Sequence, residues 1–303
     1  MNFSAILEQI DRELRPQLGR EGQVARYIPA LARVSPLQFG IALRTRDGEE
    51  AAAGDAAMPF SIQSVSKLFS LTLAMRLLGD DLWTRMQREP SGSAFNSLVQ
   101  LESEQGVPRN PFINAGAIGV SDRLCSVGRA KERLLGMLSG LCGEAIDFDE
   151  EVAASEAATG FRNVALANFM KSFGKIDNDV DAVLDLYFHQ CAIRMSCIQL
   201  ARAAGYLCRD GDHPLGGEPV VSERQARRLN ALMLTCGTYD AAGEFAYRIG
   251  LPCKSGVGGG IVGVVPDTLT LCVWSPGVDA SGNSVLGMKA LELFASRTGL
   301  SIF

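Results

Sequence analysis

Apolar and polar residues follow a helical period at the start of the chain and a strand-like pattern shortly afterwards. Over residues 3–18, apolar side chains recur every three or four positions among charged ones, which predicts an amphipathic helix. Over residues 37–53, two short apolar runs flank Arg46-Asp47-Gly48, and Asp-Gly between extended segments is typical of a β-hairpin. The chain therefore opens with a helix and a pair of strands.

The helical period returns near residue 64 and persists to about residue 240. Leu68, Leu71 and Met75 recur at helical spacing in its first part. Further on, Ser222 and Gln225 fit a capping box, in which each side chain bonds the other residue's backbone N–H at the start of a helix. The middle of the chain is therefore expected to be predominantly helical.

From Leu251 onward the pattern changes to that of strands. Residues 262–265 and 270–274 are rich in residues that favour strands, and Pro266-Asp267 between them predicts a turn. A last helical pattern follows Asn283-Ser284. Strands at both ends of the chain predict one sheet built from distant parts of the sequence.

This order of elements predicts an α/β (α+β) fold with a discontinuous domain organisation. Residues 1–60 and 241–303 would form an α/β sheet domain, and residues 61–240 a helical domain. We expect the active site between the two, where pockets commonly form.

Composition describes an ordinary folded protein and excludes several functional classes. Apolar residues make up 47% and charged residues 21% of the 303 positions. The formal net charge of -5 argues against nucleic-acid binding, which selects clustered Lys and Arg. No basic segment followed by an apolar run opens the chain, and no span approaches the roughly 20 apolar residues of a membrane helix. We therefore expect a cytoplasmic protein that binds neither nucleic acid nor membrane.

Cysteine and histidine follow no pattern typical of a metal site. The eight cysteines form no CxxC pair, and most lie among apolar residues, where buried free thiols are expected. There are only two histidines, His189 and His213, and neither lies near a nucleophile motif. We expect no metal and no cofactor, and proton transfer by Lys, Tyr or a carboxylate.

The strongest local chemical signal is Ser64-Val65-Ser66-Lys67, an S-x-x-K pattern that opens the first long helix. Residues three apart share a helix face, so the lysine amine can reach the serine hydroxyl. Serine is a poor nucleophile until a base accepts its proton, and a partly desolvated lysine at a helix start loses its charge more readily. The tetrapeptide also occurs by chance in many helices, so it needs a second signal.

That second signal is Lys254-Ser255-Gly256, which leads into the glycine-rich residues 257–260. Serine β-lactamases and penicillin-binding proteins pair S-x-x-K with a Lys-Thr/Ser-Gly strand beside the nucleophile. Glycines there allow a substrate to approach the main chain. A glycine-rich hairpin or bulge is the structural alternative, but the two motifs in this order favour a serine hydrolase.

Longer segments resemble one family in particular, the glutaminases. These segments are Gln63-Ser64-Val65-Ser66-Lys67, Asn110 to Ile118, Leu251 to Val257, Tyr27-Ile28-Pro29, Glu156 followed by Gly160 and Asn163, Leu186-Tyr187-Phe188, and Cys236 to Asp240. The resemblance runs from about Tyr27 to the C-terminus. It implies a β-lactamase/penicillin-binding-protein-like fold, with an antiparallel sheet flanked by helices and an all-helical domain. It also implies a homo-oligomer, either a dimer or a tetramer.

The resemblance implies that the protein hydrolyses L-glutamine to L-glutamate and ammonia. Ser64 would be the nucleophile and Lys67 its base. The reaction would pass through a glutamyl ester on the enzyme, which water then hydrolyses. Tyr27 and Tyr239 would line the reaction centre, and one of them would relay a proton to the departing ammonia. Val257 would supply a backbone N–H to the oxyanion hole, together with that of Ser64.

The remaining roles implied by the resemblance concern substrate binding. Glu156 can accept from the α-ammonium of glutamine in a charge-assisted hydrogen bond, while amides and phenols bind the carboxylate. The full substrate-binding set is Gln63, Ser64, Asn114, Glu156, Asn163, Tyr187, Tyr239 and Val257, with Lys254, Ser255 and Gly256 in support. Asn114 as a helix cap, Tyr187 as a core residue and Glu156 as a solvated carboxylate are the alternatives.

Two other functions remain open at this point. A penicillin-recognising serine hydrolase would share both motifs, although a Ser-Asp-Asn or Tyr-x-Asn element is not evident. A non-catalytic glutamine-binding module would keep the pocket without needing Ser64, Lys67 and Tyr239. Asparagine is a nearer alternative substrate, because one methylene discriminates by only about 1–3 kcal/mol.

Overall fold

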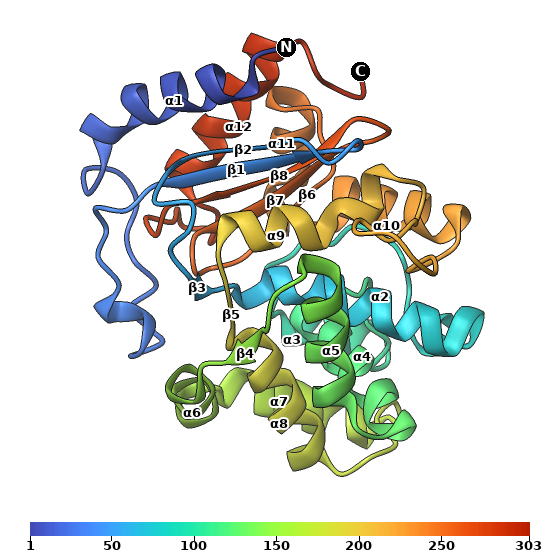
Figure 1. The fold of residues 1–303 in the computed structure, drawn as a ribbon. Helices are drawn as coiled ribbons and strands as arrows, with labels where there is room; N and C mark the ends of the chain where they lie inside the picture. Colours follow the sequence, from blue (N-terminus) through green and yellow to red (C-terminus); the bar gives the residue numbers. More distant parts are fainter.

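The computed structural model describes all 303 residues and shows helices packed on both faces of a five-stranded sheet (Figure 1). The strands are β1 (Gly40–Thr45), β2 (Glu50–Gly54), β3 (Phe60–Ser61), β4 (Asp147–Phe148), β5 (Ile193–Met195), β6 (Cys253–Ser255), β7 (Gly260–Val265) and β8 (Leu269–Trp274). The helices are α1 (Phe3–Leu14), α2 (Ser66–Leu78), α3 (Leu98–Ser103), α4 (Asn114–Val127), α5 (Ala130–Cys142), α6 (Glu150–Thr159), α7 (Phe161–Ser172), α8 (Val180–Cys191), α9 (Cys197–Ala203), α10 (Glu223–Cys236), α11 (Ala242–Arg248) and α12 (Val285–Thr298).

The main sheet joins the two ends of the chain, as the sequence predicts. Its order is β2-β1-β8-β7-β6, and every neighbouring pair is antiparallel. β1 pairs with β8 over its whole length, from Gly40 opposite Trp274 to Thr45 opposite Leu269. The predicted α/β class with an antiparallel sheet flanked by helices is confirmed. The division of the chain into two domains stays a prediction.

Helices cover both faces of this sheet, which explains the composition of its central strands. Every residue of β7 and β8 is buried, so neither strand shows the alternation of a sheet with one wet face. α1 and α12 pack on one face and α9 on the other (Figure 1). Beyond α9, the largest apolar cluster continues from β7 and β8 into α2, α5 and α10. The sheet and the helical part thus share one continuous core.

The first helix ends earlier than its apolar period suggests. Phe3, Leu7, Ile10 and Leu14 are its buried residues, at the spacing of one helix face. Beyond Leu14 the chain forms a short 3-10 turn, because proline at position 16 lacks the backbone N–H and crowds the preceding turn. The helix starts predicted at Ser222 and Ser284 are confirmed, since Ser222 forms a capping box on α10 and Ser284 caps α12, whereas α2 begins at Ser66 and not at Ser64.

A second, small sheet of order β3-β5-β4 interrupts the helical part, and the sequence pattern did not predict it. Its strands contain two or three residues each, too few to produce a recognisable period. Ser61 of β3 lies opposite Arg194 of β5, just beyond the C-terminal end of α8. This pairing fixes the chain immediately before Ser64.

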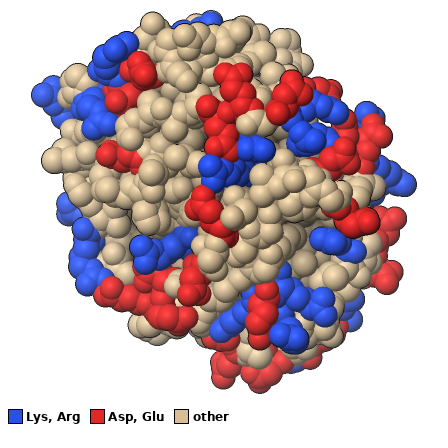
Figure 2. Space-filling model, in the orientation of Figure 1, with Lys and Arg blue, Asp and Glu red and all other residues tan.

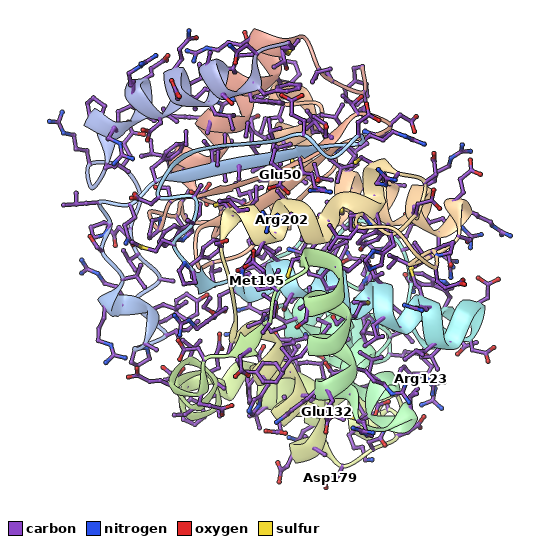
Figure 3. All side chains as sticks on the ribbon, in the orientation of Figure 1. Glu50, Arg123, Glu132, Asp179, Met195 and Arg202 are labelled. Atoms are coloured by element: carbon purple, nitrogen blue, oxygen red, sulfur yellow. The ribbon has the colours of Figure 1, made fainter.

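Charged groups of both signs lie beside one another on the face drawn in Figure 2. Figure 2 shows Lys and Arg interspersed with Asp and Glu over the visible face. Arg202 of α9, labelled in Figure 3, bridges Glu50 of β2 at 2.7 Å and Glu144 after α5 at 2.6 Å. These ion pairs connect the main sheet to the helical part. None of the helices has both the length and the apolar character required to cross a membrane.

Candidate active site

A cavity of about 320 Å³ lies where the start of α2 meets α4, α6, α8 and the loop after β6. Eight of the predicted site residues line it, namely Tyr27, Gln63, Ser64, Asn114, Glu156, Asn163, Tyr187 and Val257. Lys67 and Tyr239 lie behind this lining and contact its residues, and Lys254 packs against the Tyr239 ring. Ser255 and Gly256 belong to the strand edge that carries Val257. Distant sequence segments therefore meet at one site.

Ser64 is presented by a sharp turn between β3 and α2. The turn is a 3-10 helix, η3 (Gln63–Val65), and α2 itself begins only at Ser66. Gln63 has φ of +49°, a left-handed conformation that is costly for a residue with a side chain. This conformation turns the chain so that the buried Ser64 reaches the cavity wall.

Lys67 is buried in the first turn of α2, with only 1% of its surface exposed. Its Nζ donates to Asn114 Oδ1 at 2.6 Å and to the carbonyl of Phe112 at 3.2 Å, rather than to the Ser64 hydroxyl. Burial lowers the pKa of Lys67 to about 8, although Cys191 and Glu156 act in the opposite direction. The amine therefore loses its charge more easily than a surface lysine does.

Tyr239 places its hydroxyl beside Ser64 and the backbone N–H of Val257. Burial raises the pKa of Tyr239, and the neighbouring Ser64 hydroxyl and Val257 N–H act in the opposite direction. The Tyr239 hydroxyl nevertheless has no partner with full hydrogen-bond geometry, and the Val257 N–H donates to no backbone carbonyl. Tyr239 also has φ of +58°, so two residues beside Ser64 have a left-handed backbone.

Lys254 supports Tyr239 from β6. Its buried Nζ donates to the carbonyls of Gly237 at 3.0 Å and Ser255 at 2.6 Å, and lies 5.1 Å from the centre of the Tyr239 ring. Burial and the charge of Lys67 lower the pKa of Lys254 well below its ordinary value. Lys254 thus contacts the turn that carries Tyr239 and does not line the cavity.

Glu156 supplies a buried carboxyl group to the opposite side of the cavity. It lies on α6 and is only 6% exposed, so it is not the solvated carboxylate of the alternative interpretation. Burial raises the pKa of Glu156 to about 7, while a hydrogen bond from the Gln63 side chain and the charge of Lys67 act in the opposite direction. The carboxyl group is therefore poised to change charge near neutral pH.

Amide and phenol groups complete the polar wall. Asn114, the first residue of α4, donates from Nδ2 to Asn163 Oδ1 at 2.9 Å and is not the helix cap. Tyr187 of α8 is 2% exposed and has its ring 6.0 Å from Lys67 Nζ. Tyr27 lies at the rim and remains 62% exposed. Around these neutral donors and acceptors, the lining holds two acids, the buried Glu156 and the half-buried Asp279, and one exposed cation, Arg162.

The sequence analysis missed several residues of the cavity. Phe95 lines it and packs against the Tyr239 ring, with ring centres 4.8 Å apart. Cys191 lines it from the end of α8, and residues 279–282 line it from the loop before α12. Asp-Ala-Ser-Gly in that loop is a turn composition, but nothing local to it indicates which cavity the loop faces.

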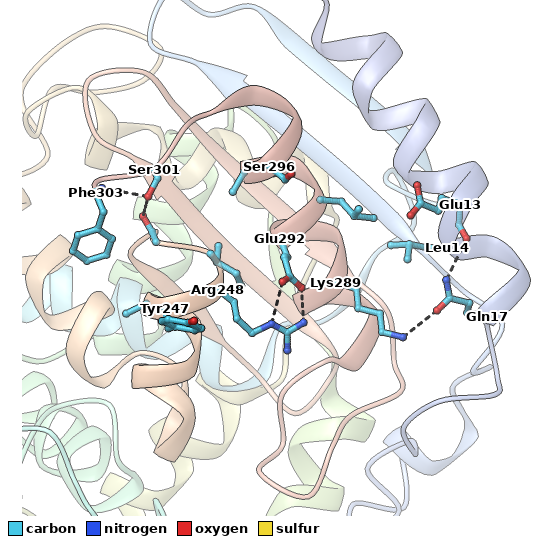
Figure 4. Close-up of a pocket in the computed structure, with 15 residues that line it drawn as sticks. Glu13, Leu14, Gln17, Tyr247, Arg248, Lys289, Glu292, Ser296, Ser301 and Phe303 are labelled. Carbon is cyan, nitrogen blue, oxygen red and sulfur yellow. Dashed lines mark hydrogen bonds and ion pairs between the residues drawn. The ribbon is translucent and has the colours of Figure 1, made fainter.

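A larger hollow of about 720 Å³ lies on the far side of the main sheet, between α1, α11, α12 and the C-terminus (Figure 4). Its charged side chains are already paired, Arg248 with Glu292 and Lys289 with Glu21 and Gln17. It contains no nucleophile next to a base. The chemistry therefore belongs to the smaller cavity.

Comparison with known proteins gives consistent results along the chain. The sequence profile of the family described as Glutaminase matches residues 22–303. A glutaminase of Rhizobium meliloti (strain 1021) is 57% identical, over 100% of this chain and 97% of the relative. A glutaminase of Rhodopseudomonas palustris (strain BisB5) is 58% identical, over 97% of this chain and 96% of the relative.

Solved structures agree with these sequence relatives. A Bacillus glutaminase studied in the presence of 4.3 M NaCl superposes with a TM-score of 0.91 at 35% identity, over 100% of both chains. A probable glutaminase from Bacillus subtilis, complexed with 6-diazo-5-oxo-L-norleucine, superposes with a TM-score of 0.90 at 34% identity. That match covers 100% of this chain and 97% of the other. The likeness thus includes every segment that lines the cavity.

Proposed function

The chain belongs to the glutaminase family, and from that premise we propose that it hydrolyses L-glutamine to L-glutamate and ammonia with Ser64 as nucleophile and Lys67 as base. The observation that carries this proposal is the environment of Lys67 Nζ. A neutral amine has two N–H donors and one lone pair, whereas an ammonium has three donors. The two acceptors around Nζ, from Asn114 and Phe112, match the neutral form. Its lone pair is then free to accept the Ser64 proton.

The reaction proceeds in two steps, the formation of a glutamyl ester on Ser64 and the hydrolysis of that ester. Ser64 Oγ bonds to the side-chain amide carbon of glutamine while its proton passes to Lys67, and the negative charge forms on the amide oxygen. The backbone N–H groups of Ser64 and Val257 stabilise that charge, and removing one such donor typically costs about 3–4 kcal/mol. The carbon–nitrogen bond then breaks, a proton reaches the leaving nitrogen, and ammonia departs. Water hydrolyses the remaining glutamyl ester.

Tyr239 is the better placed of the two tyrosines for the proton relay. Its buried hydroxyl lies beside Ser64 and has no fixed partner, so it can accept a proton on one side while donating on the other. Such a relay never requires a charged phenolate, in keeping with the raised pKa of this group. Tyr27 is largely exposed at the rim, where it would cover the substrate rather than transfer protons.

Substrate recognition follows from the distribution of charge in the cavity. Glu156 is the buried acid of the lining and would receive the α-ammonium of glutamine, with Gln63 beside it. Asn114, Asn163 and Tyr187 would orient the α-carboxylate through neutral groups. The compound named in one Bacillus subtilis complex is an L-norleucine derivative, so it carries the same α-ammonium and α-carboxylate as glutamine.

Assembly and location stay predictions from the sequence. The homo-oligomer, a dimer or tetramer, rests on the family resemblance, and light scattering of the purified protein would test it. The cytoplasmic location is likewise a prediction, which cell fractionation would test. Neither prediction enters the mechanism above.

Replacing Ser64 with Ala tests the proposal. We expect kcat for glutamine to fall by roughly 10⁴- to 10⁶-fold, because the glutamyl ester cannot form without the Ser64 hydroxyl. Ser66→Ala is the matched control, since Ser66 is also buried, has no hydrogen-bond partner and does not line the cavity. Ammonia release by both variants is measured at saturating glutamine. Turnover of the Ser64 variant close to that of the control would exclude Ser64 as nucleophile.

A trapping experiment tests the ester intermediate. Hydroxylamine competes with water for a glutamyl ester and yields glutamyl hydroxamate, while ammonia release continues. We expect the hydroxamate fraction to rise with hydroxylamine concentration and a glutamyl adduct to appear on the Ser64 peptide after acid quenching. Direct attack of water on the amide would give neither product.

A further inference from the structure

Ser61 is a buried serine that has no role in the reaction described above. It lies in β3, is 8% exposed, and does not line the cavity. Its hydroxyl donates to the carbonyl of Cys191 at 2.9 Å and accepts from Nε2 of Gln63 at 3.0 Å. Both of these neighbours line the cavity. Ser61 therefore connects the end of α8 to the residue that precedes Ser64.

The hydrogen bonds of Ser61 determine which way the Gln63 amide points. A serine hydroxyl has one proton, and here the proton is used on the Cys191 carbonyl, which can only accept. Ser61 Oγ must then accept from Gln63, and only the nitrogen of an amide can donate. The hydroxyl thus selects one of the two orientations that an amide side chain can take.

The selected orientation also determines what Gln63 offers to Glu156. Gln63 and Glu156 line the same cavity, and the Gln63 side chain acts on the pKa of Glu156 as a hydrogen-bond donor, because an ionised carboxyl group can only accept. One proton on Nε2 therefore serves Ser61, the other is available to Glu156, and Oε1 is left as an acceptor. A flipped amide would turn its oxygen toward the carboxylate, which repels it.

The backbone around this contact is packed too closely to shift. A Cβ on Gly258 would lie 2.4 Å from the carbonyl oxygen of Ser61 and 3.3 Å from Cγ of Gln63. Ser61 is also paired with Arg194 of β5. With the backbone fixed on both sides, the amide of Gln63 retains its own side-chain rotation, and the Ser61 hydroxyl limits that rotation.

We propose that Ser61 is a positioning residue for substrate binding, which holds the Gln63 amide nitrogen toward Glu156 so that this carboxylate stays ionised and aligned with the α-ammonium of the substrate. The inference rests on the proposed function, in which Glu156 receives that ammonium. It extends the site to a residue that touches no substrate atom.

The charges around Glu156 set the expected direction of a pH effect. Lys67 of α2, Tyr187 and Cys191 of α8, and Tyr27 from the N-terminal segment all face this carboxyl group. Among the neighbouring groups, the Gln63 hydrogen bond and the Lys67 charge favour the ionised form. Losing the hydrogen bond raises the pKa of Glu156 further, so the acid limb of kcat/KM moves to higher pH.

The test compares Ser61→Thr with Ser61→Val, because threonine and valine have the same shape and differ in the hydroxyl. We expect the Thr variant to resemble the wild type and the Val variant to show a KM for glutamine roughly tenfold higher, with kcat changed less than about threefold. The acid limb of kcat/KM should move to higher pH in the Val variant alone. Ser61→Ala provides the same loss without added bulk if both larger variants unfold.

A second substrate separates positioning from a general structural defect. Glutaramic acid has the side-chain amide and carboxylate of glutamine but no α-amino group. We expect the Thr and Val variants to hydrolyse it equally, because the Gln63–Glu156 pair has no ammonium to bind. A Val variant impaired equally on both substrates would overturn the inference, and so would equal KM values of the Thr and Val variants for glutamine.

The wild type on glutaramic acid distinguishes failure of the inference from failure of its premise. If the wild type shows no preference for glutamine over glutaramic acid, the role of Glu156 in the proposed function is wrong, and the Ser61 inference fails with it. If the wild type prefers glutamine while the Thr and Val variants behave alike, only the role of Ser61 is wrong.

Discussion

The two sides of the main sheet differ in the kind of side chain that they bury. On one side, α1 and α12 cover β1, β7 and β8 with a purely apolar cluster, the outer core, which includes Leu7, Ile10, Leu271 and Phe294. On the other side, where β6 meets α2, the reaction centre buries Lys67 and Lys254 at 1% exposure and Glu156 at 6%. The first region buries apolar side chains, as folding favours, whereas the second buries ionisable groups, which folding disfavours.

The contrast shows where the molecule obtains stability and where it gives some up. Burying a charged group is unfavourable unless the group is paired, and the pKa values of all three groups move toward the uncharged form. Gln63 and Tyr239 add left-handed backbone conformations. The outer core has no comparable cost, so substitutions in the two regions should affect different measurements.

Among the variants that compare the two regions, Lys67→Met should have the largest effect on activity and a small effect on stability. We expect kcat to fall by roughly 10²- to 10⁴-fold, because the base is lost. Removing a buried amine relieves its desolvation but leaves the acceptors on Asn114 and Phe112 unpaired, so the unfolding free energy should change by less than about 1 kcal/mol. Urea unfolding at pH 7 and steady-state kinetics measure the two quantities. A loss of stability as large as that of a core truncation would contradict the comparison.

Phe294→Ala should show the opposite pattern. Phe294 is fully buried in the outer core and its ring stacks on Phe3 with centres 6.4 Å apart. Truncation should lower the unfolding free energy by about 3–5 kcal/mol, with kcat/KM unchanged below the melting temperature. Phe294→Leu, which retains most of the volume, is the control and should lose less. A drop in kcat at 25 °C would show that the outer core also positions the reaction centre.

As the pH rises, activity should increase, whereas the contribution of Glu156 to stability should decrease. Activity requires ionised Glu156 and neutral Lys67, with pKa values of about 7 and about 8, so kcat/KM should rise between about pH 6 and 9. The Glu156 pKa is raised above its ordinary value of 4.5, so ionisation favours the unfolded chain as the pH rises from 4.5 through 7. This carboxyl group should therefore cost up to roughly 3 kcal/mol of stability above pH 7.

Glu156→Gln isolates that carboxyl group. The variant should bind glutamine poorly at every pH, and its unfolding free energy should fall less than that of the wild type between pH 4.5 and 7. Parallel urea titrations of the two proteins across this range measure the difference. Identical slopes would mean that Glu156 titrates as a surface carboxyl group does.

The smallest effect is expected from substitutions at two glutamines that share a left-handed backbone conformation. Gln105 has φ of +54° and is exposed, and Gln63 has φ of +49° and is buried. Gln105→Gly should raise the unfolding free energy by less than about 1 kcal/mol with activity unchanged, because glycine adopts this conformation without strain. Gln63→Gly relieves the same strain but removes the donor to Glu156, so its KM should rise. Equal KM values in both variants would exclude a binding role for Gln63.

Much of the fold could be predicted because its signals are local. Helix caps such as Ser222 and Ser284 and the central strands of the sheet follow from short patterns. β3 and β5 could not be predicted, since two- and three-residue strands depend on partners distant in the sequence. Proline at position 16 shortened the first helix, an effect that the apolar period alone does not reveal.

The site residues that belong to sequence motifs were predicted. Those that reach the cavity only through packing of the folded chain were missed. Ser64, Lys67 and Lys254 belong to recognisable motifs, and the structure brings them together. Phe95 and the loop of residues 279–282 have no chemical signature and reach the cavity only because the chain folds back over it. Nor did the motif indicate that Lys67 would bond to Asn114 rather than to Ser64. Their roles in catalysis stay predictions until the variants above are measured.

The pairing of β1 with β8 has a consequence for synthesis of the protein in the cell. β1 leaves the ribosome long before β8, the strand with which it pairs along its whole length. Val257, and the strand edge that carries it, also emerge late. A nascent chain that already contains Ser64 and Lys67 therefore lacks one wall of the cavity, and hydrolysis cannot begin until β6, Val257 and β8 have also been synthesised.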